Sequence, residues 1–354
     1  DDYWEKRNTA ETQWYKELHK KLVRLSLPER DLRWSDEVNL LFDKREFTFL
    51  FVNDDVTDDD RREVLCILLG WFFASSYPLL RYRVSRRLTA ILQQYPKDSL
   101  PLLKRFIKVN DPYVVQGILA SIYGCCLMVQ DKNLVDEVSH FIYSSLIEVR
   151  SDVLNDLIVR QWTFKMLDLA HHLNPDNELI FAVKTPLVAE DTSLSRLVAA
   201  GIKESKDCFG SDKGSWKLWY SLYDFSDFNR YIIGTNSHIT SNVFFYEDER
   251  NQLKGVNLMS MINEIATWIK SQGWNSLLGK LDINRYRDGR YDNRKERLGK
   301  KYQWLGLFNL EGRLLDSARV VDFYTYNSAP NAEDVIKSPR VWNTGDYSCF
   351  DPTL

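Results

Sequence analysis

The stretch "RKERLGKKYQW", residues 294–304, groups the residues of this chain that most resemble a chemical or binding site. Two aromatic residues, Tyr302 and Trp304, stand beside five cations: Arg294, Lys295, Arg297, Lys300 and Lys301. Basic side chains between aromatic rings are typical of surfaces on which single-stranded nucleic acid stacks. The same combination occurs in protein interfaces. The stretch is therefore compatible with a surface that binds nucleic acid, with a surface that binds protein, and with a purely structural role.

Helical geometry divides these residues between two faces. In a helix, Arg294, Arg297 and Lys301 would form one basic stripe, because they stand at i, i+3 and i+7. Lys300 would lie at its edge, and Trp304 nearer the basic side. The opposite stripe would be apolar and would include Leu298, Tyr302, Leu305 and Phe308. This pattern predicts a helix docked on a core, with Arg297 and Lys301 forming ion pairs within their own domain or a contact with another protein.

A second basic cluster, "RYRVSRR", spans residues 81–87. On a helix, Arg83 and Arg87 share a face and Arg86 lies beside them, opposite Val84 and Leu88. A solvated face or salt bridges between helices would explain the cluster. A contact with a polyanion or an acidic protein is the alternative.

A nuclease site would need acidic residues that converge on a divalent cation. Asp282, Asp288 and Asp292 with Lys295 are the candidates, but their spacing does not enforce convergence, and a charged loop that enters a helix is favoured. The neighbours His171 and His172 would point to different sides of a helix. The sequence also contains neither a Walker-type phosphate loop nor a GxSxG motif. We therefore predict no catalytic residue, no metal and no cofactor in this chain.

Composition indicates an intracellular protein and does not favour a generally basic nucleic-acid binder. The formal net charge is -3 over 354 residues, and 44% of the residues are hydrophobic. The five cysteines show no regular spacing, which favours reduced thiols and a cytoplasmic location. The apolar run from Val64 to Phe73 is far short of the ~20 residues that span a bilayer, so we predict a core helix and no membrane contact. The opening Asp1 and the closing "DPTL" predict a fragment of a longer protein.

The pattern of elements predicts a mainly α fold: an irregular HEAT-like α-solenoid, followed by a mostly helical, aromatic-rich domain with long loops. Successive helices of roughly 20 residues with short breaks favour helix pairs, although no strict repeat is visible. Thr57 and Asp58, Pro78, and Asp111 with Pro112 are the expected helix starts, and Gly273 follows a helix end. The predicted regions are a helical and charged segment (1–60), helical repeats (61–180), a linker (181–200) and a C-terminal domain (201–354).

Four blocks occur in one order and together resemble one family. They are "RYRVSRRLTAILQQYPKDSLPLLKRFIKVNDPYVVQGILASIYGCC", "DFSDFNRYIIG", "GRYDNRKERLGKKYQWLGLFNLEGRLLD" and the terminal "DYSCFDPTL". From about residue 75 to 354, the chain resembles the large bacterial ATP-binding proteins of the STAND NTPase type, of the AVAST antiphage class. It departs from the family pattern at Asn229, at Asn309 and at Gln116-Gly117, where an acid-Arg pair is expected. The last departure puts in doubt an essential role for that pair.

The resemblance implies the C-terminal sensor of a multidomain protein. An upstream effector and a P-loop ATPase, with ATP and Mg²⁺, would belong to the parent protein, and activation would involve oligomerisation. The sensor would bind a phage protein, such as the large terminase subunit or the portal. Candidate binding residues on this hypothesis are Arg83, Arg86, Arg87, Tyr231, Arg294, Arg297, Lys300, Lys301 and Trp304. Nucleic-acid binding through the basic segments Arg81–Arg87 and Arg294–Lys301 is the alternative.

Overall fold

The structure, a computed structural model, is mainly α-helical, as the sequence predicts. It describes residues 15, 17–46, 56–188, 192–198, 215–223, 228–233, 244–247, 253–285, 296–321 and 335–336. Helical elements of the N-terminal part are α2 (Leu27–Arg30), η1 (Asp31–Ser35), α3 (Asp36–Asp43), α4 (Asp59–Phe72), α5 (Pro78–Gln94), η3 (Pro96–Asp98), α6 (Ser99–Phe106), α7 (Pro112–Val129), α8 (Lys132–Ile142), η4 (Tyr143–Ile147), η5 (Asp152–Asn155), α9 (Leu157–Leu173) and α10 (Leu179–Ala182).

Three helices of this part begin where the sequence predicts. Asp58 caps α4 by accepting a hydrogen bond from the backbone N–H of Arg61 at 2.7 Å. Asp111 caps α7 in the same way, through the N–H of Tyr113. Pro78 is the first residue of α5, a position whose N–H has no partner within the helix. These starts are confirmed.

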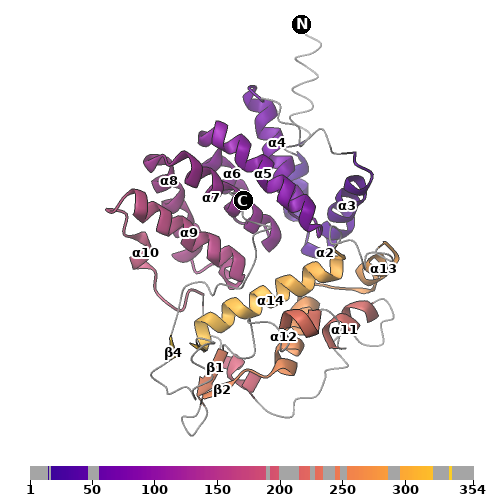
Figure 1. Cartoon of the computed structure of the whole chain (residues 1–354). Helices are drawn as coiled ribbons and strands as arrows, with labels where there is room; N and C mark the ends of the chain where they lie inside the picture. The colour runs from indigo at the N-terminus through magenta and orange to yellow at the C-terminus, as the bar shows by residue number, and fades with distance from the viewer. Residues whose placement is uncertain are drawn as a thin grey trace.

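The helices between residues 59 and 173 stack in two layers (Figure 1). Helices α5, α7 and α9 contact one another in that order, while α4, α6 and α8 cover them. This arrangement agrees with paired helices, and the HEAT-like solenoid stays an interpretation. Helix α7 is long and apolar enough to cross a membrane by composition, but 72% of it is buried inside the fold, as in the core helix of a soluble protein. The predicted core run Val64–Phe73 lies mostly in α4, whose Trp71 and Phe72 are fully buried.

The C-terminal part combines helices with a small sheet that the sequence did not predict. Its helical elements are η6 (Thr192–Val198), α11 (Trp216–Tyr223), η7 (Phe228–Ile233), α12 (Leu258–Ser271), α13 (Ser276–Arg285) and α14 (Leu298–Ser317). Four antiparallel strands pair in the order β2 (Leu253–Gly255), β1 (Phe244–Glu247), β3 (Arg319–Val321) and β4 (Val335–Ile336). In the register, Tyr246 faces Lys254 and Val320 faces Ile336. Such short strands show too few alternations for a sequence signal.

Helix α12 follows its prediction closely. Ile262, Ile265 and Ile269 are fully buried along one side. Gly273 lies just beyond the helix end with φ of 91°, a left-handed conformation in which glycine has no steric penalty.

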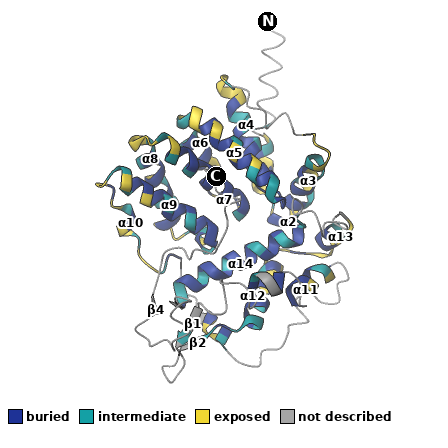
Figure 2. Ribbon diagram, in the orientation of Figure 1, coloured by how far each residue is buried: buried dark blue, intermediate teal, exposed yellow. Residues whose placement is uncertain are grey.

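Helix α14 lies between the two parts of the molecule (Figure 1). It contacts α9 and η5 on one side and α11, α12 and α13 on the other. Its approach to η5 is so close that a Cβ on Gly312 would lie 2.0 Å from the carbonyl oxygen of Asn155. Figure 2 shows this helix mostly in the colour of buried residues. One hydrophobic core therefore extends through both parts.

The stretch predicted as a linker, residues 181–200, takes part in this core. Among its described residues, Leu187, Val188, Leu194 and Leu197 are buried. Leu187 and Val188 also donate backbone hydrogen bonds to Asp316 of α14. The stretch is thus packed against the fold, whereas the remaining domain boundaries stay a prediction.

A buried histidine predicts acid sensitivity of the N-terminal part. The indole N–H of Trp71 donates to Nδ1 of His19 at 3.1 Å, and burial lowers the pKa of His19 to about 4. Because the folded protein holds this ring neutral, its contribution to stability is complete above pH 6.5 and is lost as the pH falls toward 4. We expect urea unfolding midpoints to fall across this window. His19→Gln, which does not titrate, should make the decline shallower, and an unchanged pH profile would contradict the assignment.

Candidate functional site

The first turn of α14 places a lysine in the interior, where it joins three distant segments. Lys301 is fully buried. Its ammonium group donates to Asp31 at 2.8 Å, to Asp111 at 2.9 Å and to the backbone carbonyl of Ala74 at 2.9 Å. These acceptors belong to η1, to the cap of α7 and to the turn after α4. All three ammonium protons therefore have an acceptor.

Arg30 completes a buried group of four charges, called here the buried charge cluster: Arg30, Asp31, Asp111 and Lys301. The guanidinium of Arg30 lies 3.7 Å from Asp111 and donates to the carbonyl oxygens of Leu22 and Leu25. The side chains of all four residues are fully buried. The two cations balance the two carboxylates, which is a condition for burying charge at tolerable cost.

Electrostatics in the cluster favour a structural role. Burial raises the pKa of Asp31, although the nearby Lys301 opposes this shift. Burial also raises the pKa of Tyr302 well above its ordinary value, and the neighbouring Asp31 carboxylate adds to the increase. A general acid or base must reach its substrate, whereas these groups are enclosed. The cluster therefore holds segments together and does not perform acid–base chemistry.

The predicted basic stripe of Arg294, Arg297 and Lys301 is wrong. Helix α14 begins at Leu298, and Arg297 is its N-cap in an extended conformation. Arg297 pairs with Asp282 of α13 at 2.8 Å, and the other oxygen of Asp282 accepts from the N–H of Gly299 at 3.0 Å. Asp282 thereby starts the helix, because a carboxylate is favourable at the positive N-terminal end. Arg294 lies outside the described residues, as do Asp288, Asp292 and Lys295.

The other end of α14 is fixed by a second buried ion pair. Arg160 of α9 donates two parallel hydrogen bonds to Asp316, at 3.1 and 3.0 Å. The same carboxylate accepts the backbone N–H groups of Leu187 and Val188, at 3.1 and 3.3 Å. Bidentate Arg–carboxylate pairs are strong and directional. Both ends of α14 are therefore anchored to the helical stack.

Two buried acids, Asp156 at the start of α9 and Glu311 of α14, belong to the contact between these anchors. Gln116, at the departure from the family pattern, donates to both oxygens of Asp156, the N-cap of α9. Burial raises the pKa of Asp156 to about 6. Burial also raises the pKa of Glu311 in α14 well above its ordinary value, and Asp156 contributes to that shift.

The remaining predicted site residues are separated by the fold. Lys301, predicted for binding, is enclosed and cannot contact a partner without unfolding its surroundings. Lys300 and Trp304 are half-buried, and Trp304 packs edge-on against Phe228. The side chain of Tyr231 lies outside the described part of the chain. On α5, Arg83 and Arg86 are exposed and Arg87 is half-buried, which agrees with a solvated face and equally with the alternative of a polyanion contact.

The structure nevertheless joins the chain before α5 to the chain before α14. The hydroxyl of Ser76, two residues before α5, donates to the carbonyl of Glu296, two residues before α14, at 2.7 Å. Arg83 and Arg86 have no carboxylate partner within the described residues. This proximity links segments more than 200 residues apart in sequence, and no local sequence signal could reveal it.

Sequence reasoning missed the partners of Lys301 and an aromatic surface. Lys301 stands three residues after Leu298 and four before Leu305, both fully buried, so its position on the apolar face was the available signal. Nothing in the sequence pointed to Asp31, because it lies 270 residues away. The missed surface consists of Trp216, Tyr220 and Leu277, which are 50%, 45% and 61% exposed.

Comparisons with known proteins add no relative. No protein-family model, no curated protein and no solved structure matches the chain. Within the described residues, no group of three or more His, Cys, Asp and Glu side chains could hold a metal ion.

Proposed function

We propose that the chain is a protein-recognition module, the C-terminal sensor of an antiviral STAND NTPase that binds a phage protein. The observation that supports it best is the aromatic surface formed by Trp216, Tyr220 and Leu277. The rings of Trp216 and Tyr220 lie 6.2 Å apart in an edge-on arrangement. Leu277 belongs to α13, which contacts α11. Exposed Trp and Tyr side chains are enriched among the residues that contribute most to protein binding.

A route exists from this surface to the rest of the molecule. Helices α11 and α13, which present the surface, both contact α14. Helix α14 is in turn joined to the helical stack by Lys301 at its start and by Asp316 at its end. A partner that displaces α11 or α13 would therefore also move α14 and strain the buried ion pairs of Lys301 and Asp316 at its two ends. This arrangement suits a sensor that transmits binding to upstream domains of the same polypeptide.

The other parts of the proposal follow from the family resemblance. The parent protein would be bacterial and cytoplasmic, and its upstream domain would bind ATP and Mg²⁺. This chain itself would perform no catalysis and would not contact a membrane. Binding of a phage packaging or structural protein would promote homo-oligomerisation, which would activate the effector.

Removing the exposed indole tests the recognition surface. We expect Trp216→Ala to weaken binding of a purified phage terminase or portal protein by about 30-fold or more, corresponding to the ~2 kcal/mol of a dominant interface residue. Phe181→Ala is the matched control, because Phe181 is 64% exposed on α10 in the other part of the molecule. Isothermal titration calorimetry would measure both variants. Equal affinities of the two variants, or no binding by the unaltered chain to any of these proteins, would contradict the proposal.

Nucleic-acid binding is the second candidate, favoured by the bond from Ser76 to Glu296 that joins the chain before α5 to the chain before α14. On this alternative, binding should weaken steeply with salt. Arg83→Ala combined with Arg86→Ala should reduce the slope of log K against log salt by about one per lost phosphate contact. Lys132→Ala, an exposed cation on α8, is the control. A slope unchanged by the double substitution would rule out this surface.

A further inference from the structure

Glu311 of α14 is a buried acid without a bonding partner in the described part of the chain. Its side chain is 1% exposed, and neither carboxyl oxygen has a hydrogen-bond partner among the residues that the structure describes. A buried carboxylate normally bonds to donors or pairs with a cation, because transfer of its charged form out of water is very unfavourable. The charged form of Glu311 is therefore strongly disfavoured where it lies.

A second buried acid lies across the contact that Glu311 helps to form. The neighbouring Gly312 packs so closely against η5 that a Cβ there would lie 2.0 Å from the carbonyl oxygen of Asn155. Asp156, the next residue and the N-cap of α9, is 2% exposed. Burial raises the pKa of Glu311 most, and the charge of Asp156 raises it further. Two acids thus meet where α14 contacts the helical stack.

Of these two acids, Asp156 is the one whose surroundings favour the ionised form. Its two oxygens accept from the amide of Gln116 at 2.9 Å, and one of them also accepts from the backbone N–H groups of Ile158 and Val159. Burial raises the pKa of Asp156 to about 6, and these bonds oppose the increase. Glu311 accepts no such bond from a described residue. A proton held at this contact therefore resides on Glu311.

Ion pairs formed by α14 and by the elements packed against it do not include Glu311. Arg160 acts electrostatically on Asp156, and Asp111 raises the pKa of Asp156. The described pairs are Arg160–Asp316, Lys301–Asp31, Lys301–Asp111, Arg297–Asp282, Arg313–Glu264 and Arg196–Glu264. On the elements packed against α14, the remaining described charged side chains are exposed or half-buried: Asp152, Lys165, Asp168, Lys217, Lys270 and Lys280.

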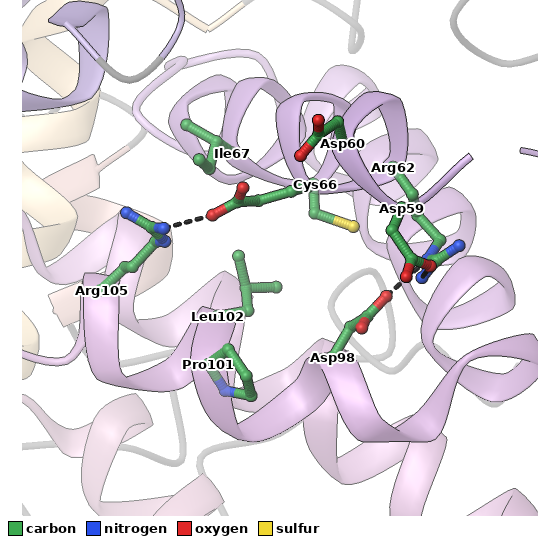
Figure 3. Close-up of a pocket in the computed structure, with 10 residues that line it drawn as sticks. Asp59, Asp60, Arg62, Cys66, Ile67, Asp98, Pro101, Leu102 and Arg105 are labelled. Atoms are coloured by element: carbon green, nitrogen blue, oxygen red, sulfur yellow. Dashed lines mark hydrogen bonds and ion pairs between the residues drawn. The ribbon is translucent and has the colours of Figure 1, made fainter. Parts of the chain in front are cut away.

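The pocket between α4 and α6 shows the contrasting case, in which acids are matched by cations (Figure 3). Asp98 pairs with Arg62, and Glu63 pairs with Arg105. These pairs lie at the edge of the stack and do not involve α14. Helix α6 is therefore a suitable internal reference for changes that begin at Glu311.

We propose that Glu311 and Asp156 form a proton-dependent latch between α14 and the helical stack. With a proton on Glu311, the two acids lie together in the interior and α14 stays packed against η5. When that proton passes to water, two negative charges remain in the contact, and Glu311 gains hydration by separating from Asp156. Proton loss therefore loosens the contact. The latch acts on the helix that joins the aromatic surface to the stack, and its test needs no binding partner.

The pH dependence of the latch is opposite to that of His19. Since the pKa of Glu311 is raised in the folded protein, its contribution to stability is complete below pH 4.5 and is lost as the pH rises through the raised value. Asp156 contributes with the same sign between pH 3.8 and about 6. Comparison of a variant with the unaltered chain at the same pH removes the contribution of His19.

Amide hydrogen exchange between about pH 5 and about pH 9 tests the latch, with Glu311→Gln as the variant that cannot ionise. As the pH rises, exchange in η5 and in the second half of α14 should become faster in the unaltered chain than in this variant. The increase should reach up to about ten-fold per pH unit, the limit for release of one proton. Comparison at one pH also cancels the intrinsic pH dependence of exchange. A rate ratio that does not change with pH would overturn the proposal.

Two further variants and the reference helix locate the effect. Glu137→Gln, at an exposed position on α8, should follow the unaltered chain at every pH. Asp156→Asn retains a capping oxygen for α9 and should make the increase smaller, because Asp156 adds to the cost of ionising Glu311. An equal increase in α6 would show general loosening and overturn the latch. If Glu311→Gln does not fold, the ratio of exchange in η5 to that in α6 of the unaltered chain should still rise with pH, and a constant ratio would contradict the proposal.

Discussion

Replacing Lys301 with Met should lower the free energy of unfolding by about 3–5 kcal/mol, because removing one partner leaves charge buried without compensation. Asp31 and Asp111 would lose the ammonium group that lies 2.8 and 2.9 Å away, and both are fully buried. Met retains the length of the side chain, so the loss would report charge and hydrogen bonding more than volume. Equilibrium unfolding in urea measures the change.

The adjacent residue provides the control. Lys300 is only half-buried on the same helix turn, and Lys300→Met should change stability by less than about 0.5 kcal/mol. If Lys301→Met fails to fold, Asp111→Asn is the second variant, since it retains a cap for Tyr113 while it removes one charge. Adding Asp111→Asn to Lys301→Met should then cost less than the sum of the single changes, because the pair restores charge balance. Equal stabilities of the Lys300 and Lys301 variants would show that the buried charge cluster is absent in solution.

The second large effect concerns the far end of α14, where we expect Asp316→Leu to destabilise the protein more than Arg160→Leu does. Either change leaves one buried charge unpaired, at a cost of about 3–5 kcal/mol. Loss of Asp316 also removes the acceptor for the N–H groups of Leu187 and Val188. Each unsatisfied buried donor adds about 1–3 kcal/mol. Urea unfolding of both variants gives the order of the two effects.

Asp316→Asn separates these contributions, since its amide oxygen still accepts a backbone hydrogen bond. It should be less destabilising than Asp316→Leu. Because Leu187 and Val188 lie in the stretch predicted as a linker, amide hydrogen exchange should rise there in Asp316→Leu and remain slow in Arg160→Leu. Equal exchange in the two variants would show that Asp316 does not hold this segment.

The sequence alone determined local features whose causes are local. Short-range capping placed the starts of α4 and α7, because the donor and acceptor lie within a few residues of each other, and Pro78 placed the start of α5. Periodicity identified the buried faces of α12 and α14, including Tyr302 and Leu305. The ion pair expected for Arg297 within its own domain is present, with Asp282 as the partner, whereas Lys301 pairs with Asp31 and Asp111 of the two preceding predicted regions.

Only the tertiary structure decided which distant segments meet. The partners of Lys301 come from positions 31 and 111, and the partner of Arg160 comes from position 316. Such pairs depend on which helices pack against each other. A sequence pattern shows the periodicity of one helix but does not identify the element that packs against it. The same reason explains the wrong stripe in "RKERLGKKYQW". Lys301, assigned there to a basic stripe with Arg297, is directed inward, where it meets the carboxylates of Asp31 and Asp111.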